Sequence, residues 1–275
     1  MYYCKNILVC GGDKRQKYMY RQMLADGLNV KSYAIGEENS VSADDIKDFD
    51  VIIFPVPVSR DGINLNAPMV DYGINLGDIL NRIGKNRIVL GGMCDRIDFD
   101  MIDYFKDEKL QMYNAIPTAE GALRIAMENT ERTLYGSRCL VLGYGRIGKV
   151  LSERLADMGA EVTVCTRNEK DVALAEVMGH KAVKLDYISG CLQGSEIIFN
   201  TIPKTVVTGD MLGEISKSAL IIDLASKPYG IDMTAAEVLG RKVIVASGLP
   251  GKFTPESSGA ILKDVIMKIL IEMEV

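Results

Sequence analysis

The sequence predicts an α/β protein of two domains, each built on a parallel β-sheet with helices on both faces. Short apolar runs rich in β-branched residues alternate with helix-patterned segments along the 275 residues, which is typical of such sheets. The alternation occurs in two series, with a long helix-forming segment between them. This length suits two compact domains better than one, and 48% hydrophobic residues are enough for two cores.

The two series give the expected elements in chain order. The first predicts a small flavodoxin-like sheet, with strands at 6–10, 31–35, 51–55 and 87–90 and helices at 14–26 and 76–83. The second predicts a six-stranded, doubly wound sheet, with strands at 139–142, 161–165, 182–185, 197–201, 220–223 and 242–246.

Two helices are expected to connect the domains. Pro117 and Thr118 precede apolar residues at helical spacing, so we expect a helix that begins there with Thr118 as its cap. Near the C-terminus, Pro255 opens a second helix with one apolar face, formed by Ile261, Leu262, Val265, Ile266, Ile269 and Leu270. We expect this helix to return to the first domain, so the predicted domains are residues 1–117 with 255–275, and residues 118–254.

A glycine-rich turn follows the strand at 139–142. In the pattern Gly-x-Gly-x-x-Gly, the first glycine permits a tight turn, the second lets backbone amides approach a pyrophosphate, and the third lets the following helix pack on the strand. The second series is therefore interpreted as a Rossmann dinucleotide-binding domain. The expected cofactor contacts in this turn are Gly143, Gly145, Arg146, Ile147 and Gly148.

The end of the next strand favours NADP over NAD. NAD enzymes place an acidic residue there for the adenosine ribose, but this strand ends in Thr166 and Arg167, with Lys170 close behind. A hydroxyl and a guanidinium suit a 2′-phosphate. The alternative is that Arg167 stacks on the adenine or points into water.

Three loops follow the later strands of the second domain. They should meet at one edge of the sheet, because the carboxyl ends of parallel strands lie together. Read singly, each is also an ordinary turn rich in Gly, Pro, Asn and Ser. The cofactor contacts predicted from these loops are Asn200, Thr201, Ile202, Pro203, Asp223, Ala225, Ser226, Gly248, Leu249 and Pro250.

Arginines follow the strands of the first domain, which predicts a small acidic substrate. Guanidinium groups bind carboxylates bidentately, and we favour Arg15 and Arg60 for this role while leaving Arg96 open. The alternative is that these arginines are solvated surface charges. The predicted substrate contacts are Arg15, Pro57, Ser59, Arg60, Thr118, Ser257 and Ser258, the last two through a helix amino terminus.

Proton transfer has few candidates. Glu120 and Asp13 are the predicted catalytic acid or base, although Glu120 near a helix start also has a plain electrostatic explanation. His180 is the only histidine, and it lies in a turn at the end of the sheet opposite to the cofactor, where a surface or turn role is expected. Six scattered cysteines lack the close spacing of zinc or dithiol sites, so we expect reduced thiols and no metal.

Several of these motifs together resemble the dipicolinate synthase A family over nearly the whole chain. They are 11–15, 55–57, 117–121, 143–148 and 248–252. The resemblance implies NADP-linked oxidation of dihydrodipicolinate, derived from the lysine-pathway hydroxytetrahydrodipicolinate, to pyridine-2,6-dicarboxylate. It also implies a cytosolic protein of the sporulating mother cell that works with a partner, the flavoprotein-like dipicolinate synthase B. Lys14 and Lys17, which flank Arg15, depart from the family pattern.

Charge and hydropathy narrow the remaining functions. A net charge of −5 and no basic run argue against nucleic acid, and the sequence predicts neither a signal peptide nor a membrane span, so we expect a cytoplasmic protein. We expect a homo-oligomer as well. Two alternatives stay open: another NADP-dependent small-acid dehydrogenase, of shikimate-dehydrogenase or methylene-tetrahydrofolate-dehydrogenase type, and a non-catalytic protein that binds NADP.

Overall fold

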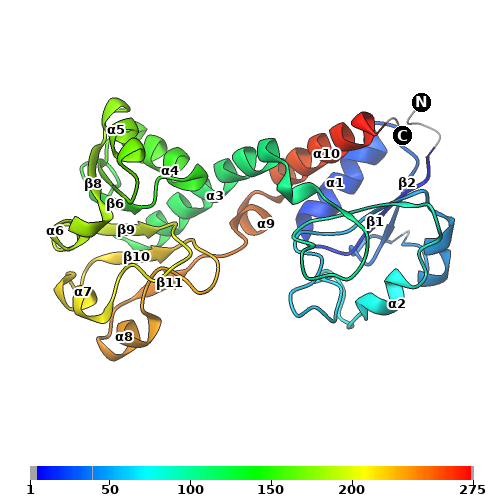
Figure 1. The fold of residues 1–275 in the computed structure, drawn as a ribbon, viewed down its shortest axis with the longest axis horizontal. Helices are drawn as coiled ribbons and strands as arrows, with labels where there is room; N and C mark the ends of the chain where they lie inside the picture. The colour runs from blue at the N-terminus through cyan, green and yellow to red at the C-terminus, as the bar shows by residue number, and fades with distance from the viewer. Residues whose placement is uncertain (1–4, 39, 274–275) are drawn as a thin grey trace. The chain divides into compact units, whose positions relative to one another are not determined.

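The computed structural model describes residues 5–38 and 40–273. It contains two compact units. Unit 1 is Met1–Asn114 with Pro250–Val275, and unit 2 is Ala115–Leu249. The boundaries expected from the sequence lie a few residues further along the chain in both places. Each unit has its own parallel sheet (Figure 1), as the predicted two-domain α/β fold requires.

Unit 1 has a five-stranded parallel sheet in the order β2-β1-β3-β4-β5. This is the flavodoxin-like order, so the predicted fold of this part is confirmed. The strands are β1 (Ile7–Cys10), β2 (Val30–Tyr33), β3 (Val51–Ile53), β4 (Ile88–Gly91) and β5 (Ile102–Asp103), and the helices include α1 (Lys14–Ala25) and α2 (Leu76–Leu80). The sequence did not predict β5, because two residues are too few to show a strand period.

The C-terminal helix α10 (Pro255–Glu272) belongs to unit 1 and packs beside α1 (Figure 1). Its apolar stripe supplies Leu262, Ile266 and Leu270 to the same core as Met19 and Met23 of α1. All five side chains are at most 3% exposed. Residues from the two ends of the chain therefore build one core.

The crossing of α1 and α10 depends on Gly259. A Cβ at this position would lie 2.7 Å from the carbonyl oxygen of Arg15 and 2.9 Å from the amide nitrogen of Met19. These are backbone atoms, so the two helices would have to separate. We expect Gly259→Ala to lower the free energy of unfolding by roughly 1–3 kcal/mol, as overpacking does. Urea unfolding measures this.

Gly213 provides the matched control for that variant. It lies in α7 (Gly209–Glu214), and a Cβ there would meet nothing within 4 Å. Gly213→Ala should be neutral or slightly stabilising, because alanine is the better helix former. Equal urea midpoints for the two variants would contradict the close helix crossing.

Unit 2 has a six-stranded parallel sheet in the order β11-β10-β9-β6-β7-β8. Numbered within the unit, this is the doubly wound strand order of a Rossmann fold, so that prediction is confirmed. The strands are β6 (Arg138–Leu142), β7 (Glu161–Thr166), β8 (Lys181–Lys184), β9 (Ile197–Asn200), β10 (Leu220–Asp223) and β11 (Val243–Val245). The helices include α4 (Arg146–Asp157), α5 (Glu169–Val177), α6 (Ile188–Leu192) and α8 (Met233–Val238).

The predicted start of the connecting helix is wrong. Helix α3 runs without a break over Glu108–Asn129, with Pro117 inside it. Its start is capped by the Asp107 side chain, which accepts a hydrogen bond of 2.9 Å from the Leu110 amide. Thr118 is therefore not a cap, and Glu120 does not lie near a helix start. Proline is so common at the first helical position that Pro117 gave a false start signal.

The described cysteines are buried or half-buried thiols. Cys10, Cys94, Cys139, Cys165 and Cys191 form no disulfide, while Cys4 lies outside the described residues. Burial raises the pKa of Cys139 and Cys165 to about 12.

Two features are absent from the described ranges. Within them, no group of three His, Cys, Asp or Glu side chains is placed to hold a metal, and no helix is long and apolar enough to cross a bilayer.

Candidate dinucleotide and substrate sites

The three glycines of the turn after β6 have three different environments. Gly143 has φ of +94°, and a Cβ there would overlap Thr201 Oγ1. A Cβ at Gly148 would overlap the carbonyl oxygen of Gly143, so α4 packs on the turn at the distance that only glycine allows. At Gly145, by contrast, a Cβ would meet nothing within 4 Å. The exposed second glycine leaves room for a pyrophosphate, as a dinucleotide turn requires.

The residues around this turn fit a phosphate. Gly145 is the N-cap of α4, so Arg146 and Ile147 place the first amides of the helix beside the open space. The amino end of a helix favours an anion, because its first N–H groups are unpaired and its dipole is positive there. The turn could therefore hold the pyrophosphate of a dinucleotide.

The end of β7 carries positive charge. Arg167 and Lys170 are exposed, whereas Thr166 is 5% exposed. The first acidic residues after this strand already have partners: Glu169 pairs with Lys184, and Asp171 accepts a hydrogen bond of 3.1 Å from Asn168. Glu169 is exposed as well, but its charge is paired, so Arg167 and Lys170 supply the positive charge at the place where a ribose or its 2′-phosphate is expected.

Asn200 and Asp223 correct one sequence prediction. Both residues were predicted to contact the cofactor, but both are 0% exposed and their side chains are joined by a hydrogen bond of 2.8 Å. Asp223 also accepts hydrogen bonds from the amides of Ala225 (3.0 Å) and Gly230 (2.8 Å). The pair therefore holds the loops after β9 and β10 in place, because a buried carboxylate needs such donors.

Thr201 lies between this pair and the glycine turn. Its hydroxyl donates a hydrogen bond of 2.8 Å to the carbonyl oxygen of Leu142, the last residue of β6. The amide of Ile202 bonds to Asn200 Oδ1 at 3.1 Å, which fixes the next residue of the loop. Of the remaining predicted contacts, Pro203, Ser226 and Gly248 are exposed, while Ala225, Leu249 and Pro250 are buried.

In unit 1, two predicted site residues bind each other. Arg15 donates from Nε to Asp13 Oδ1 at 3.0 Å and from Nη2 to Asp13 Oδ2 at 2.9 Å. Asp13 also caps α1 by accepting from the Arg15 amide at 2.9 Å. This argues against Asp13 as a free general base and gives it an orienting role.

Two neighbours fix the Arg15 guanidinium further. Its Nη2 donates to the carbonyl oxygen of Val56 at 2.9 Å. A Cβ at Gly251 would lie 2.5 Å from Asp13 Oδ2 and 3.1 Å from Arg15 Nε, so this glycine is needed for the close approach of α9 (Leu249–Phe253). Nη1 of Arg15 makes no hydrogen bond within residues 5–38 and 40–273, which leaves a donor for a ligand carboxylate.

The loop after β3 brings Arg60 towards the same group of residues. Asn66 accepts from Arg60 Nε at 3.3 Å and donates to the carbonyl oxygen of Pro57 at 3.0 Å. Pro57 follows Val56, to which Arg15 is bonded, through a cis peptide bond. The hydroxyl of Ser59 already has a partner in its own loop, because it donates a hydrogen bond of 3.0 Å to Asp61 Oδ1.

The other predicted substrate and catalytic residues lie on helices α10 and α3. Ser258 is 3% exposed, its hydroxyl donates to the Thr254 carbonyl at 2.8 Å, and its amide is already bonded within α10, which corrects the prediction of a ligand contact. Ser257 is exposed in the first turn of that helix. Thr118 and Glu120 belong to unit 2, where Glu120 pairs with Arg154 at 3.2 Å.

That ion pair argues against a catalytic role for Glu120 at the cofactor turn. Arg154 is eight residues beyond Arg146, the first residue of α4, so it lies about 12 Å further along the helix. His180 precedes β8, as expected, but it is buried rather than exposed. Its ring lies 3.3 Å from Glu153 and makes an edge contact with Tyr144.

Comparisons with known proteins agree with this geometry. Residues 6–114 match the family model of the N-terminal domain of dipicolinate synthase A, and residues 110–225 match the NAD binding domain of D-isomer specific 2-hydroxyacid dehydrogenases. Dipicolinate synthase A of Bacillus subtilis (strain 168) is 29% identical over 98% of this chain and 96% of its own.

Two crystal structures extend the similarity to three dimensions. Dipicolinate synthase A from Bacillus halodurans is 28% identical, with a TM-score of 0.90 over 98% of this chain and 99% of that chain. The protein from Bacillus subtilis is also 28% identical, with a TM-score of 0.85 over 98% and 97%. The resemblance to dipicolinate synthase A is confirmed.

The dipicolinate synthase A resemblance covers both units of the chain. Together with the dehydrogenase-type NAD-binding match, it supports an oxidoreductase that binds NAD or NADP. A transhydrogenase from Sinorhizobium meliloti, 14% identical with a TM-score of 0.70, covers 97% of this chain and 94% of that chain and shows a shared fold alone.

Proposed function

We propose that this chain catalyses the NADP-linked oxidation of dihydrodipicolinate to pyridine-2,6-dicarboxylate. The observation that carries the proposal is the turn at Gly143, Gly145 and Gly148, whose three environments fit a dinucleotide, in a chain similar to dipicolinate synthase A over its length. The balance of the reaction is simple: the dihydropyridine ring loses one hydride and one proton, and NADP becomes NADPH. The precursor of dihydrodipicolinate would be the lysine-pathway hydroxytetrahydrodipicolinate.

Each unit would supply a different part of this reaction. When bound, NADP accepts the hydride. In unit 2, the glycine turn would hold its pyrophosphate, and Arg167 would bind its 2′-phosphate. In unit 1, Arg15 and Arg60 would bind the carboxylates of the substrate, since guanidinium groups match carboxylates.

The chemistry does not require a histidine base. Aromatisation of the ring favours the loss of both hydride and proton, so positioning alone can provide much of the rate enhancement. This agrees with the burial of His180, whose ring packs against Glu153 and Tyr144.

Turnover assays test the reaction. The purified chain with NADP should oxidise dihydrodipicolinate, generated from its hydroxy precursor, and the product should absorb as a pyridine dicarboxylate. Strong turnover of shikimate instead would reject the substrate assignment. Tight NADP binding without hydride transfer, both alone and with dipicolinate synthase B, would favour the non-catalytic alternative.

The preference for NADP is tested at Arg167. We expect Arg167→Asp to weaken NADP binding at least tenfold, because one charge-assisted hydrogen bond contributes about 1.5–3 kcal/mol and a carboxylate repels the 2′-phosphate. NAD binding should hold or improve, since a carboxylate can accept from the ribose hydroxyls. Calorimetric titration of both nucleotides checks this, and an unchanged ratio of their affinities removes the NADP assignment.

The cellular setting is part of the same proposal. The chain would act in the cytoplasm of the mother cell during sporulation, as a homo-oligomer and together with the flavoprotein-like dipicolinate synthase B. Co-expression with that partner, followed by size-exclusion chromatography and a turnover assay of the complex, tests the partnership. Separate elution of the two proteins, with no gain in turnover, would argue against it.

A further inference from the structure

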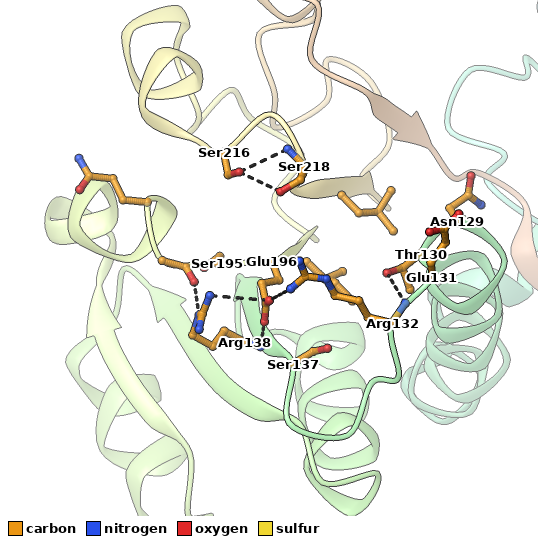
Figure 2. Close-up of a pocket in the computed structure, with 14 residues that line it drawn as sticks. Asn129, Thr130, Glu131, Arg132, Ser137, Arg138, Ser195, Glu196, Ser216 and Ser218 are labelled. Atoms are coloured by element: carbon orange, nitrogen blue, oxygen red, sulfur yellow. Dashed lines mark hydrogen bonds and ion pairs between the residues drawn. The ribbon is translucent and has the colours of Figure 1, made fainter.

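Unit 2 contains a second site candidate, a pocket of about 340 Å³ at the edge of its sheet (Figure 2). Arg138, Ile197 and Leu220 line it and are the first residues of β6, β9 and β10. The glycine turn follows the other end of β6, about 16 Å away along a strand of five residues. The pocket is therefore separate from the proposed dinucleotide site.

Two arginines converge on one carboxylate in this pocket (Figure 2). Arg132 donates from Nη1 to Glu196 Oε1, and Arg138 Nη2 lies 3.7 Å from the same oxygen. The other oxygen, Oε2, accepts a hydrogen bond of 3.0 Å from the Arg138 amide. That backbone hydrogen bond, followed by the charges of the two arginines, lowers the pKa of Glu196. The pocket thus already holds one oxyanion, which comes from the chain itself.

The arginines keep further donors. Three of their nitrogens make no hydrogen bond within residues 5–38 and 40–273: Nε and Nη2 of Arg132 and Nη1 of Arg138. The side chains of Arg132 and Arg138 are 64% and 59% exposed. Ser216 and Ser218 share one hydrogen bond of 3.0 Å between their hydroxyls, which leaves one hydroxyl hydrogen to donate. These groups are the donors that phosphate and carboxylate groups bind.

The charges around the pocket are balanced. Its lining holds Arg132 and Arg138 together with Glu131 and Glu196. Beyond the lining, Lys242 donates a hydrogen bond of 3.0 Å to Asn129, and Glu214 accepts one of 3.4 Å from Gln193. An anionic ligand would therefore take the place of the Glu196 carboxylate beside the two arginines. The volume lies at the small end of the range for ligand pockets, which indicates a small metabolite.

We propose that this pocket binds a small metabolite through a phosphate or carboxylate group held between Arg132 and Arg138, in competition with the side chain of Glu196. Guanidinium pairs of this kind bind either group bidentately. Occupation of the pocket would displace the Glu196 carboxylate from the arginines.

Calorimetric titration of the full chain tests the proposal, with inorganic phosphate and succinate as separate probes. The double variant R132Q/R138Q should weaken binding at least tenfold, whereas E196Q should strengthen it severalfold by removing the competing carboxylate. Arg124→Gln is the matched control, because Arg124 pairs with Glu128 on the exposed side of α3 and does not line the pocket. Its affinity should equal that of the wild type. The probe that binds more tightly identifies the group.

The opposite effects of the two kinds of variant separate ligand binding from a structural defect, since damage to the fold would weaken binding in both. Phosphate bound only at the glycine turn would be unaffected by R132Q/R138Q. The proposal is overturned by equal binding in wild type and double variant, by weaker binding in E196Q, or by a Kd above about 10 mM for both probes.

Discussion

Gly148→Ala should destabilise unit 2 and abolish NADP binding. The new methyl group would overlap the carbonyl oxygen of Gly143, a backbone atom in the turn that the cofactor is proposed to bind. Since neither the turn nor α4 can move without breaking the packing between them, the cost should be about 1–3 kcal/mol or more. Scanning calorimetry should show a Tm lower by roughly 5–15 °C.

Gly145→Ala should separate binding from stability. A Cβ at Gly145 has open space, and its φ of −77° suits any residue, so the Tm should stay close to that of the wild type. The methyl group would nevertheless stand where backbone amides approach the pyrophosphate, and NADP affinity should fall at least tenfold. Wild-type affinity in Gly145→Ala would contradict the proposed position of the pyrophosphate, and an unchanged Tm in Gly148→Ala would contradict the close packing.

The fold could be predicted from the sequence because its signals are local. Buried parallel strands are short apolar runs, and the same residues that form β1 or β6 show this pattern without any tertiary information. Two features were not predicted from the sequence. Strand β5 is too short to have a period, and Pro117 lies inside α3, where packing overrides its usual preference for a helix start.

The site was harder to predict, because burial and pairing are decided by tertiary structure. Asn200 and Asp223 follow strands and look like crevice residues, yet they are fully buried and bonded to each other. The contribution of Gly251 to the Asp13 and Arg15 pair depends on residues nearly the whole chain apart. A sequence pattern could have placed Asp13 and Arg15 together at the start of α1, two residues apart, but not the glycine that lies against them.

The second large effect is expected at Arg15. Arg15→Ala should raise the KM for the dicarboxylate substrate by about 10–100-fold, because a hydrogen bond to a charged group contributes about 1.5–3 kcal/mol. NADP affinity should not change, because Arg15 is not one of the residues proposed to bind the cofactor. Steady-state kinetics and calorimetric titration measure the two quantities. Weaker NADP binding would mean that this arginine serves the cofactor.

Arg21→Ala is the control on the same helix, since Arg21 is exposed and pairs with Glu37. Its KM should equal that of the wild type. The role of Asp13 then follows from Asp13→Asn, which keeps the shape of the side chain and removes its charge. If Asp13 orients Arg15, KM should rise while kcat and its pH profile stay close to those of the wild type.

If Asp13 were a general base, Asp13→Asn would instead lower kcat and leave KM close to that of the wild type. Loss of proton transfer lowers kcat by roughly 10²–10⁴-fold and removes one limb of the pH profile. The hydrogen bonds from Arg15 Nε and Nη2 and from the Arg15 amide engage both carboxylate oxygens of Asp13, which leaves it poorly placed to accept a substrate proton. We therefore expect the change in KM, and a fall in kcat alone would reject the orienting role.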